Sequence, residues 1–297
     1  MSEPARTTLL VATDLDGCLL DEQTYAWAPA APALAALRER GIPLVLVTSK
    51  TRAEVEPLAA ALGLSAPAIV ENGGAITIPF GHLRRTPSMR IEGGQFLVVL
   101  GTAREALVRA LAEIAAQTGT ALRGFASLAP QELSRLTGLS AEDAARALRR
   151  DYDEPFLVEG GEDAAEAVRR AAASRGLLVS RGGRFHHLTG PVSKGRALQR
   201  LLTLYAADGR RFTTLALGDA ANDLSLLQQA DRAIVVPRAG NVLDEALVRG
   251  LPGAERAPRP GPEGWNEAVL GALAGRTLPR VSAGQPVDRT TLKGPGG

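Results

Sequence analysis

The sequence predicts an α/β protein with a doubly wound parallel sheet and an inserted α+β domain. Short apolar runs alternate with amphipathic segments toward both ends of the 297-residue chain. This alternation is typical of a parallel sheet that is covered by helices on its two faces. In the middle of the chain the order of elements changes, and strands and helices no longer alternate regularly. An insertion between two halves of one α/β domain accounts for both observations.

The first half of the expected core domain covers residues 1–83. Continuous apolar runs indicate strands that are buried on both faces. Helical periodicity that stops at a glycine indicates helices between these strands. The expected strands are Thr8–Thr13, Ile42–Val47 and Ala68–Val70, and the expected helices are Ala30–Arg40 and Thr51–Leu62.

The second half of the core, residues 191–275, repeats this alternation. Helices are expected at Gly195–Ala206 and Asp223–Ala230, and strands at Thr214–Leu217 and Arg232–Val236. Residues 84–190 form the expected insertion. Its strands are Phe96–Leu100, Phe156–Val158 and Leu177–Ser180, and its helices are Arg104–Thr118, Ser140–Arg150 and Glu162–Arg175. The polar tail, residues 276–297, has no periodicity and is expected to be disordered.

Composition excludes several classes of function. The chain is 45% hydrophobic, its net charge is only +2, and aromatic residues make up 4%. No apolar run reaches the ~18 residues of a membrane span, and basic residues do not cluster as a nucleic-acid surface requires. Asp14 and Asp16 directly follow the first apolar run, which argues against a signal peptide. Cys18 is the single cysteine, so no internal disulfide forms and the cytoplasm is the expected location.

Lysine is scarce. Of the 34 basic residues 31 are arginine, and the three lysines are Lys50, Lys194 and Lys293. Arginine is a planar fork, whereas lysine is a compact charge on a flexible stem. A lysine that persists where arginine fills nearly every other basic position is therefore a candidate for a function that arginine cannot serve.

Two carboxylates, Asp14 and Asp16, follow the first expected strand. In a doubly wound sheet the carboxyl ends of the strands form the ligand-binding edge. Neighbouring carboxylates repel each other unless a cation neutralises them, and such oxygen ligands suit Mg²⁺. One carboxylate can then attack phosphorus while the other transfers protons. Taken alone, a polar turn after a strand explains the pair equally well.

A second polar group follows the strand Thr214–Leu217. Asp219 is placed to supply a third oxygen to a metal, with Asn222 and Asp223 one turn further on. An ordinary helix N-cap at Asp219 or Asn222 is the alternative, and it does not compete with metal binding. Two acidic strand ends in one sheet favour the metal site.

Two helix starts carry the remaining candidates. Thr48, Ser49, Lys50 and Thr51 combine hydroxyls with free backbone N–H groups, which together form an anion site. A simple N-cap explains the hydroxyls but not the lysine. Lys194 opens the other helix and can neutralise both a nucleophilic carboxylate and a phosphoryl group; a surface lysine is the alternative.

These four motifs, in this order and spacing, resemble the haloacid dehalogenase-like (HAD) phosphatases over nearly the whole chain to about residue 275. The resemblance implies a Rossmann-like core and a cap domain that reads the substrate. It implies that Asp14 attacks the phosphorus and that Asp16 protonates the leaving oxygen and later activates water. Thr48 and Lys194 would hold the phosphoryl oxygens.

The same resemblance implies a magnesium site. Mg²⁺ would bind Asp14, the backbone carbonyl of Asp16 and Asp219, while Asn222 and Asp223 support it. Cys18 departs from the family pattern, in which threonine commonly follows DxDG, and we interpret it as a packing residue and not as a second nucleophile.

Further segments resemble the mannosyl-3-phosphoglycerate phosphatase subfamily. They are Asp21–Pro29, Ser49–Thr51, Glu71–Gly73, Leu136–Ser140, Gly183–His187 and Gly261–Trp265. The expected reaction is hydrolysis of mannosyl-3-phosphoglycerate to mannosylglycerate. Its glycerate carboxylate would meet the residues Ser49, Lys50 and Thr51, with Asn72 nearby. In the cap, Arg184 and His187 are better candidates for sugar contacts than His186.

Other substrates remain open because motifs of this family do not fix the alcohol that is released. The alternatives are glucosyl-3-phosphoglycerate, sucrose phosphate or a broader set of sugar phosphates, and a phosphomutase is less favoured. A protein of another class, a noncatalytic metabolite-binding protein on the same fold, would be expected to have lost Asp14, Asp16 or Asp219. All three are present.

Overall fold

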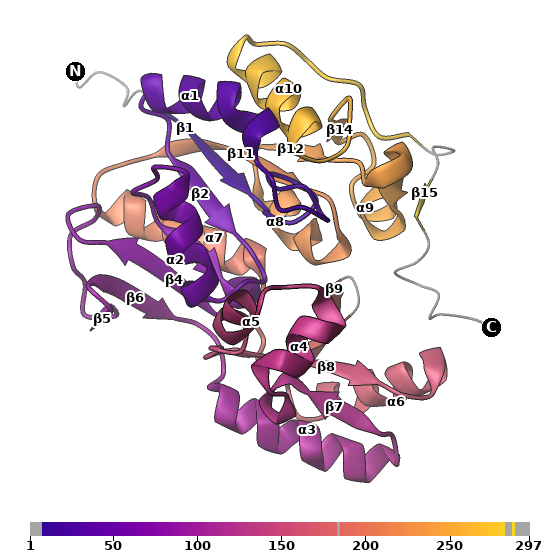
Figure 1. Ribbon diagram of the computed structural model, residues 1–297. Helices are drawn as coiled ribbons and strands as arrows, with labels where there is room; N and C mark the ends of the chain where they lie inside the picture. Colours follow the sequence, from indigo (N-terminus) through magenta and orange to yellow (C-terminus); the bar gives the residue numbers. More distant parts are fainter. Residues whose placement is uncertain (1–7, 183–184, 283–286, 289–297) are drawn as a thin grey trace.

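The computed structural model describes residues 8–182, 185–282 and 287–288. Within them a nine-stranded sheet forms the core, in the order β14-β12-β11-β1-β2-β3-β4-β6-β5, and a four-stranded sheet in the order β7-β8-β10-β9 forms a second unit. We call this second unit, residues 104–189, the cap. Figure 1 shows it below the core. The predicted α/β sheet is confirmed.

The core sheet is parallel in its centre. β1 pairs with β11 on one side and with β2 on the other, both parallel, whereas β4, β6 and β5 add an antiparallel extension beyond β3. Its strands are β1 Thr8–Thr13, β2 Leu44–Val47, β3 Ala68–Val70, β4 Ala75–Pro79, β5 Arg90–Glu92, β6 Gln95–Val99, β11 Phe212–Gly218, β12 Arg232–Val235 and β14 Glu255–Arg256.

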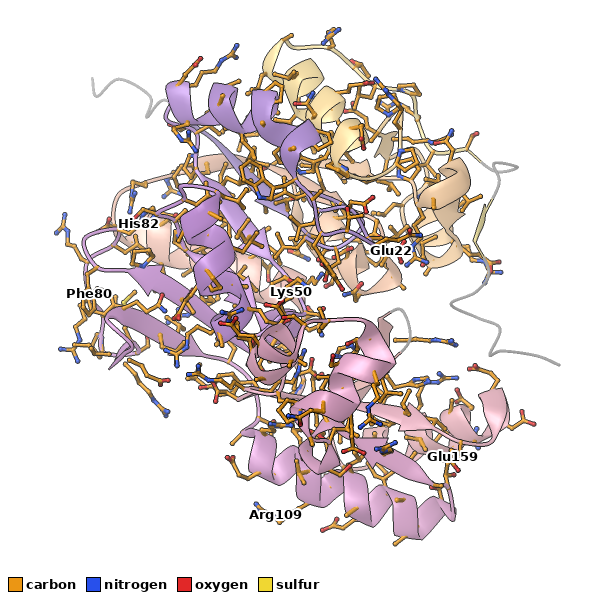
Figure 2. All side chains as sticks on the ribbon, viewed as in Figure 1. Glu22, Lys50, Phe80, His82, Arg109 and Glu159 are labelled. Atoms are coloured by element: carbon orange, nitrogen blue, oxygen red, sulfur yellow. The ribbon has the colours of Figure 1, made fainter. Side chains whose placement is uncertain are left out.

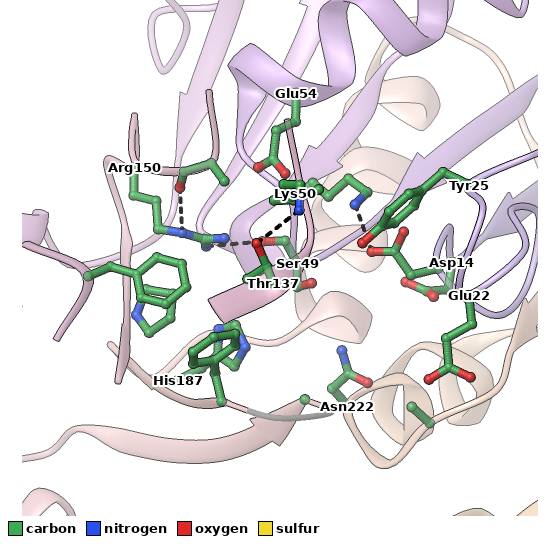
Figure 3. Close-up of a pocket in the computed structure, with 18 of the residues that line it drawn as sticks. Asp14, Glu22, Tyr25, Ser49, Lys50, Glu54, Thr137, Arg150, His187 and Asn222 are labelled. Carbon is green, nitrogen blue, oxygen red and sulfur yellow. Dashed lines mark hydrogen bonds and ion pairs between the residues drawn. The ribbon is translucent and has the colours of Figure 1, made fainter. Parts of the chain in front are cut away.

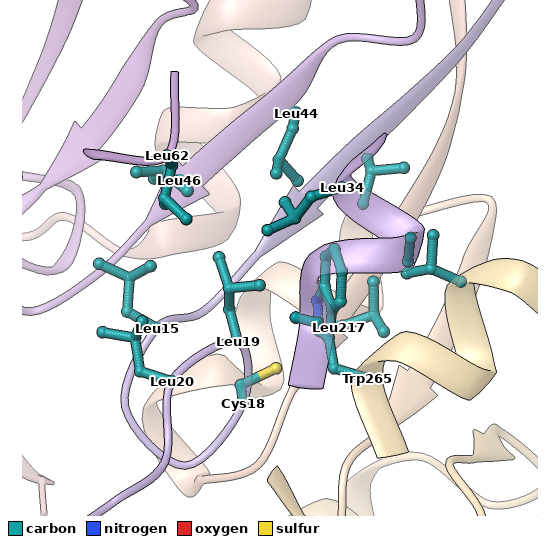
Figure 4. Close-up of a cluster of buried hydrophobic side chains, with 14 of the residues drawn as sticks. Leu15, Cys18, Leu19, Leu20, Leu34, Leu44, Leu46, Leu62, Leu217 and Trp265 are labelled. Carbon is teal, nitrogen blue, oxygen red and sulfur yellow. The ribbon is translucent and has the colours of Figure 1, made fainter. Parts of the chain in front are cut away.

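Helices cover both faces of this sheet. The core helices are α1 Ala31–Glu39, α2 Arg52–Ala61, α7 Lys194–Ala207, α8 Leu224–Gln229, α9 Glu245–Gly250 and α10 Gly261–Leu273, with 3-10 turns η1 Ala28–Ala30, η2 Glu71–Gly73, η4 Ala221–Asp223 and η5 Ala239–Asn241. Val11 of β1 packs with α1, α2 and α10, whereas its neighbours Leu10 and Ala12 pack with α7 and α8. This alternation along one strand explains why the run is apolar throughout. Figure 4 shows the first cluster around Leu34 and Trp265.

The cap has its own core. Its strands are β7 Leu122–Gly124, β8 Asp153–Val158, β9 Leu178–Gly182 and β10 Phe185–Thr189, and its helices are α3 Arg104–Thr118, η3 Phe125–Ser127, α4 Pro130–Thr137, α5 Ala141–Ala147 and α6 Gly161–Ala173. Leu107 of α3 and Val168 of α6 pack on Phe156 of β8. In Figure 2, Lys50 lies where core and cap face each other, and Arg109 lies on the outer surface of the cap.

Three details differ from the sequence prediction. Residues 90–99, expected in the insertion, form β5 and β6 of the core sheet. β10, which was not among the expected strands, is an interior strand between β8 and β9. Part of the tail is ordered: Val281 is buried in the core, and Val287–Asp288 (β15) pairs with β13 Leu243–Asp244. Residues 283–286 and 289–297 lie outside the described residues.

The turn η2 approaches the start of α7 very closely. Gly73 has a φ of +96°, and a Cβ atom built on it would lie 2.4 Å from the backbone oxygen of Ser193. Only glycine suits this position, because it tolerates positive φ and adds no side chain. The close approach fixes the position of Lys194, the next residue.

We predict that Gly73→Ala is more destabilising than Gly41→Ala. Gly41 also has positive φ (+62°), but a Cβ there meets nothing within 4 Å, so it is the control for backbone strain. Gly41→Ala should lower the free energy of unfolding by about 1–2 kcal/mol, and Gly73→Ala by at least about 1 kcal/mol more because of the clash. Urea unfolding measures both, and equal losses would contradict the proposed close packing.

Candidate active site

Asp14 sits at the end of β1, in the middle of the core sheet. Its backbone N–H donates to the oxygen of Leu217 on β11, at 3.0 Å, so the two strand ends are held side by side. The side chain is 9% exposed. Gly17, with a φ of +75°, completes the loop; a Cβ there would lie 2.9 Å from Oδ2 of Asp219. The loop after β1 therefore packs directly against the loop after β11.

The loop after β11 brings in two more carboxylates. Asp223 is fully buried, and its Oδ2 accepts hydrogen bonds from the backbone N–H groups of Asp219 and Ala220, both at 3.1 Å. The capping role expected for Asp219 or Asn222 is thus taken by Asp223. Carboxylate oxygens of Asp14, Asp219 and Asp223 lie within 4.8 Å of one another.

Lys194 connects this acidic cluster to α7. Its Nζ donates to Oδ1 of Asp14 at 2.6 Å and to Oδ1 of Asp223 at 2.5 Å, and the side chain is buried. Burial lowers the pKa of Lys194, but the two carboxylates outweigh this effect and raise it above its usual range. The surface-lysine alternative is therefore wrong, and Lys194 stays charged in the site.

The cluster carries more negative charge than its cations balance. Burial and the neighbouring Asp223 raise the pKa of Asp14 to about 7, and the same two causes raise that of Asp219 well above its usual range. Three converging carboxylates repel one another when ionised, so a further cation between their oxygens would be favourable. Oxygen ligands from Asp14, Asp219 and Asp223 fit Mg²⁺. Nε of Arg238 also lies 3.2 Å from Oδ2 of Asp219.

Asp16 lines a cavity of about 350 Å³ between core and cap. Its Oδ2 forms an ion pair with Nζ of Lys50 at 2.9 Å, and Lys50 lies over the ring of Tyr25 at 4.8 Å. Figure 3 shows Lys50, Tyr25 and Asp14 on this side of the cavity. Cys18 is buried beneath the loop, and burial and Asp14 raise the pKa of its thiol well above the ordinary value, which suits a packing residue.

The anion-site candidates divide into two groups. Ser49 and Lys50 line the cavity. Thr48 is buried, and its hydroxyl accepts a hydrogen bond from the backbone N–H of Lys50 at 3.1 Å. Thr51 is fully buried as the N-cap of α2, accepts from the N–H of Glu54, and donates to the oxygen of Arg146. The N-cap alternative is thus correct for Thr51.

The cap supplies the other wall of the cavity. Its lining side chains are largely apolar, with two basic residues among them: Phe125, Leu133, Thr137, Leu139, Ala147, Arg150, Pro155, Phe185 and His187. Phe125 and Phe185 pack edge to face with ring centres 4.9 Å apart. An apolar wall with a few polar groups is typical of a pocket for a small organic molecule.

Of the predicted cap residues, His187 reaches the cavity. Its Nδ1 lies 2.7 Å from Oδ2 of Asp153, which is completely buried. His186 is buried on the other face of β10 beside Phe156, where burial lowers its pKa to about 4. Arg184 lies outside the described residues.

Asn72 and Asn222 meet at the boundary of core and cap. Nδ2 of Asn222 donates to Oδ1 of Asn72 at 3.3 Å, and Asn222 lines the cavity. Asn72 is buried and donates to Asp153 at 3.2 Å. The structure thus brings together most of the described candidates. Thr51 is directed elsewhere, and Thr48 is buried and bonded to the backbone of Lys50.

Sequence reasoning missed three residues near the cavity. Arg238 and Arg150 line it, and Asp153 orients His187. Both arginines were hidden among the 31 arginines of the chain. The signal for Asp153 was two acidic residues, Asp153 and Glu154, at the start of an apolar strand, because a charge at a buried position requires partners.

Comparison with known proteins identifies the family. The haloacid dehalogenase-like hydrolases match residues 11–87 and 170–247. The glucosyl-3-phosphoglycerate/mannosyl-3-phosphoglycerate phosphatase of Methanococcoides burtonii is 37% identical over 262 residues, 88% of this chain and 96% of that protein. This chain belongs to the haloacid dehalogenase-like hydrolases. The prediction of a phosphatase of this family is confirmed.

Further relatives agree with this assignment. The protein of the same name from Persephonella marina is 34% identical, with the same coverage of 88% and 96%. A haloacid dehalogenase-like hydrolase from Bacteroides thetaiotaomicron superposes with a TM-score of 0.61 at 19% identity, covering 90% of this chain and 100% of that one. The HAD subclass IIB sugar phosphatase BT4131 superposes with a TM-score of 0.63 at 15% identity, covering 90% of this chain and 99% of that one. These two structures support the fold. Among the described residues, no helix is long and apolar enough to span a membrane.

Glu71 is a buried carboxylate that docks the cap segment before β8. It accepts hydrogen bonds from the backbone N–H groups of Asp151 and Tyr152 at 2.8–3.1 Å. Burial raises its pKa from 4.5 to about 7, although Arg150 and these N–H groups act in the opposite direction. The folded protein therefore binds this proton more tightly than the unfolded chain does.

We predict that Glu71→Gln changes how stability depends on pH. Between about pH 4.5 and 7 the folded wild type holds more protons at this site, so its stability falls as the pH rises through this window. The variant lacks this titration, so the stability of the wild type relative to Glu71→Gln should fall between pH 4.5 and 7 and level off above it. Urea unfolding at several pH values measures this difference.

The control is Glu39→Gln, at an exposed position of α1. The difference in free energy of unfolding between Glu39→Gln and the wild type should change much less between pH 4.5 and 7. A pH-independent difference for Glu71→Gln would contradict the raised pKa.

Proposed function

We propose that this protein is a magnesium-dependent phosphatase that removes phosphate from mannosyl-3-phosphoglycerate through an aspartyl-phosphate intermediate. The observation that carries the mechanism is the position of Lys194, whose Nζ lies 2.6 Å from Oδ1 of Asp14 within the acidic cluster. A charged lysine against a buried carboxylate at a strand end is suited to phosphoryl transfer, because positioning and charge stabilisation provide most of the catalysis.

The reaction has two steps. Asp14 attacks phosphorus, so that a bond forms between its carboxylate oxygen and phosphorus while the bond from phosphorus to the substrate oxygen breaks. Asp16 gives its proton to that leaving oxygen. Asp16 then takes a proton from water as the water oxygen attacks the same phosphorus. The bond between phosphorus and the Asp14 oxygen breaks, which releases inorganic phosphate and free Asp14. Asp14, Asp219 and Asp223 would hold Mg²⁺, which would compensate the charge of the phosphoryl oxygens. Lys194, at the start of α7, compensates the same charge.

The two walls of the cavity support this choice of substrate. The core wall carries the cation Lys50 beside Asp16, which suits a carboxylate close to the phosphate, as in 3-phosphoglycerate. The cap wall is mainly apolar with Arg150, Thr137 and His187, which suits the flat face and hydroxyls of a hexose. The relatives named above act on both glucosyl- and mannosyl-3-phosphoglycerate, so the glucosyl compound is the second candidate.

Our proposal includes Mg²⁺ as the cofactor, a small phosphorylated sugar glycerate as the binding partner, and the cytoplasm as the location. The buried, unpaired Cys18 agrees with a reducing compartment. A noncatalytic binding protein would not need to retain Asp14, Asp16, Asp219 and Lys194 in this arrangement.

A phosphate-release panel tests the substrate. With Mg²⁺, the panel compares mannosyl- and glucosyl-3-phosphoglycerate with hexose 6-phosphates, which lack the carboxylate. We expect the two glycerates to have the higher kcat/KM. A large preference for hexose phosphates would contradict the substrate, and binding without turnover of any compound would favour the noncatalytic alternative.

We predict different losses for two variants of the nucleophile loop. Asp14→Asn should lower kcat by about 10³-fold or more on every substrate, because no other group can accept the phosphoryl. Asp16→Asn should lower kcat/KM by about 10²–10⁴-fold on alkyl phosphates, and much less on p-nitrophenyl phosphate, whose leaving group needs no proton. We compare kcat/KM here because it excludes the later step, in which Asp16 activates water. Initial rates of phosphate release measure both.

Asp231→Asn, at an aspartate that binds Thr214 away from the cavity, controls for a general loss of folding. Activity that survives Asp14→Asn would overturn the nucleophile assignment. An equal loss of kcat/KM on both substrate types in Asp16→Asn would overturn its role as the acid.

A further inference from the structure

The turn η2 touches the catalytic loops from several sides. The backbone N–H of Asn72 donates to the oxygen of Thr48, and that of Glu71 to the oxygen of Lys50, both at 3.0 Å. Gly73 packs against Ser193, next to Lys194. One short turn therefore meets two of the loops that build the site.

The side chain of Asn72 extends this contact to the remaining loop and to the cap. Its Oδ1 accepts from Nδ2 of Asn222 at 3.3 Å, and its own Nδ2 donates to Oδ2 of Asp153 at 3.2 Å. Asn222 is the residue before Asp223 and lies in the loop of Asp219, whereas Asp153 begins the cap strand β8. The planar amide fixes the acceptor and the donor relative to each other, so the two partners cannot move independently.

Asp153 is the junction on the cap side. Its Oδ2 accepts three hydrogen bonds: from Asn72, from Nη1 of Arg150 at 3.1 Å and from Nδ1 of His187 at 2.7 Å. Asp153 is completely buried, while Arg150 and His187 line the cavity. The two basic side chains of the cap wall are therefore oriented by the carboxylate that also holds Asn72.

We propose that Asn72 is a positioning residue that couples the cap wall to the metal site, so that a sugar glycerate bound against the cap tightens the binding of Mg²⁺ at the acidic cluster. The path runs from His187 and Arg150 through Asp153 and Asn72 to Asn222. This inference rests on the proposed function, since it takes a sugar glycerate as the molecule that contacts the cap wall.

The coupling has a thermodynamic consequence. If a compound on the cap wall changes the affinity for Mg²⁺, Mg²⁺ changes the affinity for that compound by the same factor. The unphosphorylated product is the useful probe, because it reaches the cap wall but brings no phosphate to the metal. Tightening by the product thus reports the protein path and not a direct contact of phosphate with Mg²⁺.

The conformation of Asn72 supplies a clean substitution. Asn72 has a φ of +57°, in the left-handed region, where asparagine and glycine are the favoured residues. Asn72→Gly therefore removes the amide without straining the turn. Asn241, exposed and with a φ of +63°, offers the same change as a matched control, Asn241→Gly.

The test measures Mg²⁺ binding by isothermal titration calorimetry, with and without saturating mannosylglycerate or glucosylglycerate. We expect the better-bound product to tighten Mg²⁺ binding about fivefold or more in the wild type and in Asn241→Gly, and less than about twofold in Asn72→Gly. Asn222→Ala, which breaks the path at its core end, should lose the tightening as well. It replaces Asn72→Gly in the test if circular dichroism shows that Asn72→Gly does not fold.

The outcomes separate the two proposals. Product that binds the wild type without changing the affinity for Mg²⁺, or tightening that persists in both path variants, would overturn the coupling but leave the proposed function intact. Failure of both products to bind the wild type would contradict the proposed substrate, and this inference with it.

Discussion

The ion pair of Lys194 with Asp14 and Asp223 is the interaction on which the rest of the site depends. Three buried carboxylates would repel one another strongly without it, and removing one partner of a buried pair leaves a charge that water cannot reach. The lysine offsets only part of this charge: burial and the neighbouring Asp223 still raise the pKa values of Asp14 and Asp219. The remaining imbalance is what makes the cluster suited to a divalent cation and to a phosphate.

The fold holds this unfavourable cluster by surrounding it with rigid elements. β1 and β11 are adjacent parallel strands in register, with Thr13 opposite Leu217, so both acidic loops start from the same level of the sheet. Helix α7 is packed along one face through leucines such as Leu198 and Leu201, which places Lys194 at its N-terminus. Gly17 and Gly73 allow the loops to approach to contact distance. Packing energy far from the chemistry thereby offsets the cost of concentrating charge.

The cap adds selectivity to a core that is equipped for phosphoryl transfer. Phe125, Phe185 and His187 of the cap line the same cavity as Asp16. The cap docks on the core through polar contacts of Glu71 and Asn72 with the segment 151–153. Such contacts are directional, so they define where the cap wall lies relative to the nucleophile. A pocket built from two units can exclude water around the phosphate while it recognises the alcohol.

From the sequence one can predict the parallel core, the strand ends that carry Asp14 and Asp219, and the importance of Lys194. Apolar periodicity and composition can be read without knowing how the chain packs. The tertiary structure decided the antiparallel extension β4-β6-β5, the burial of Thr51 and the placement of Arg238. It also decided the contact of Asn72 with Asn222, which lie 150 positions apart, and of Asn72 with Asp153. Such pairings depend on how separate elements pack in space, and no local pattern of residue types shows which distant residues will meet.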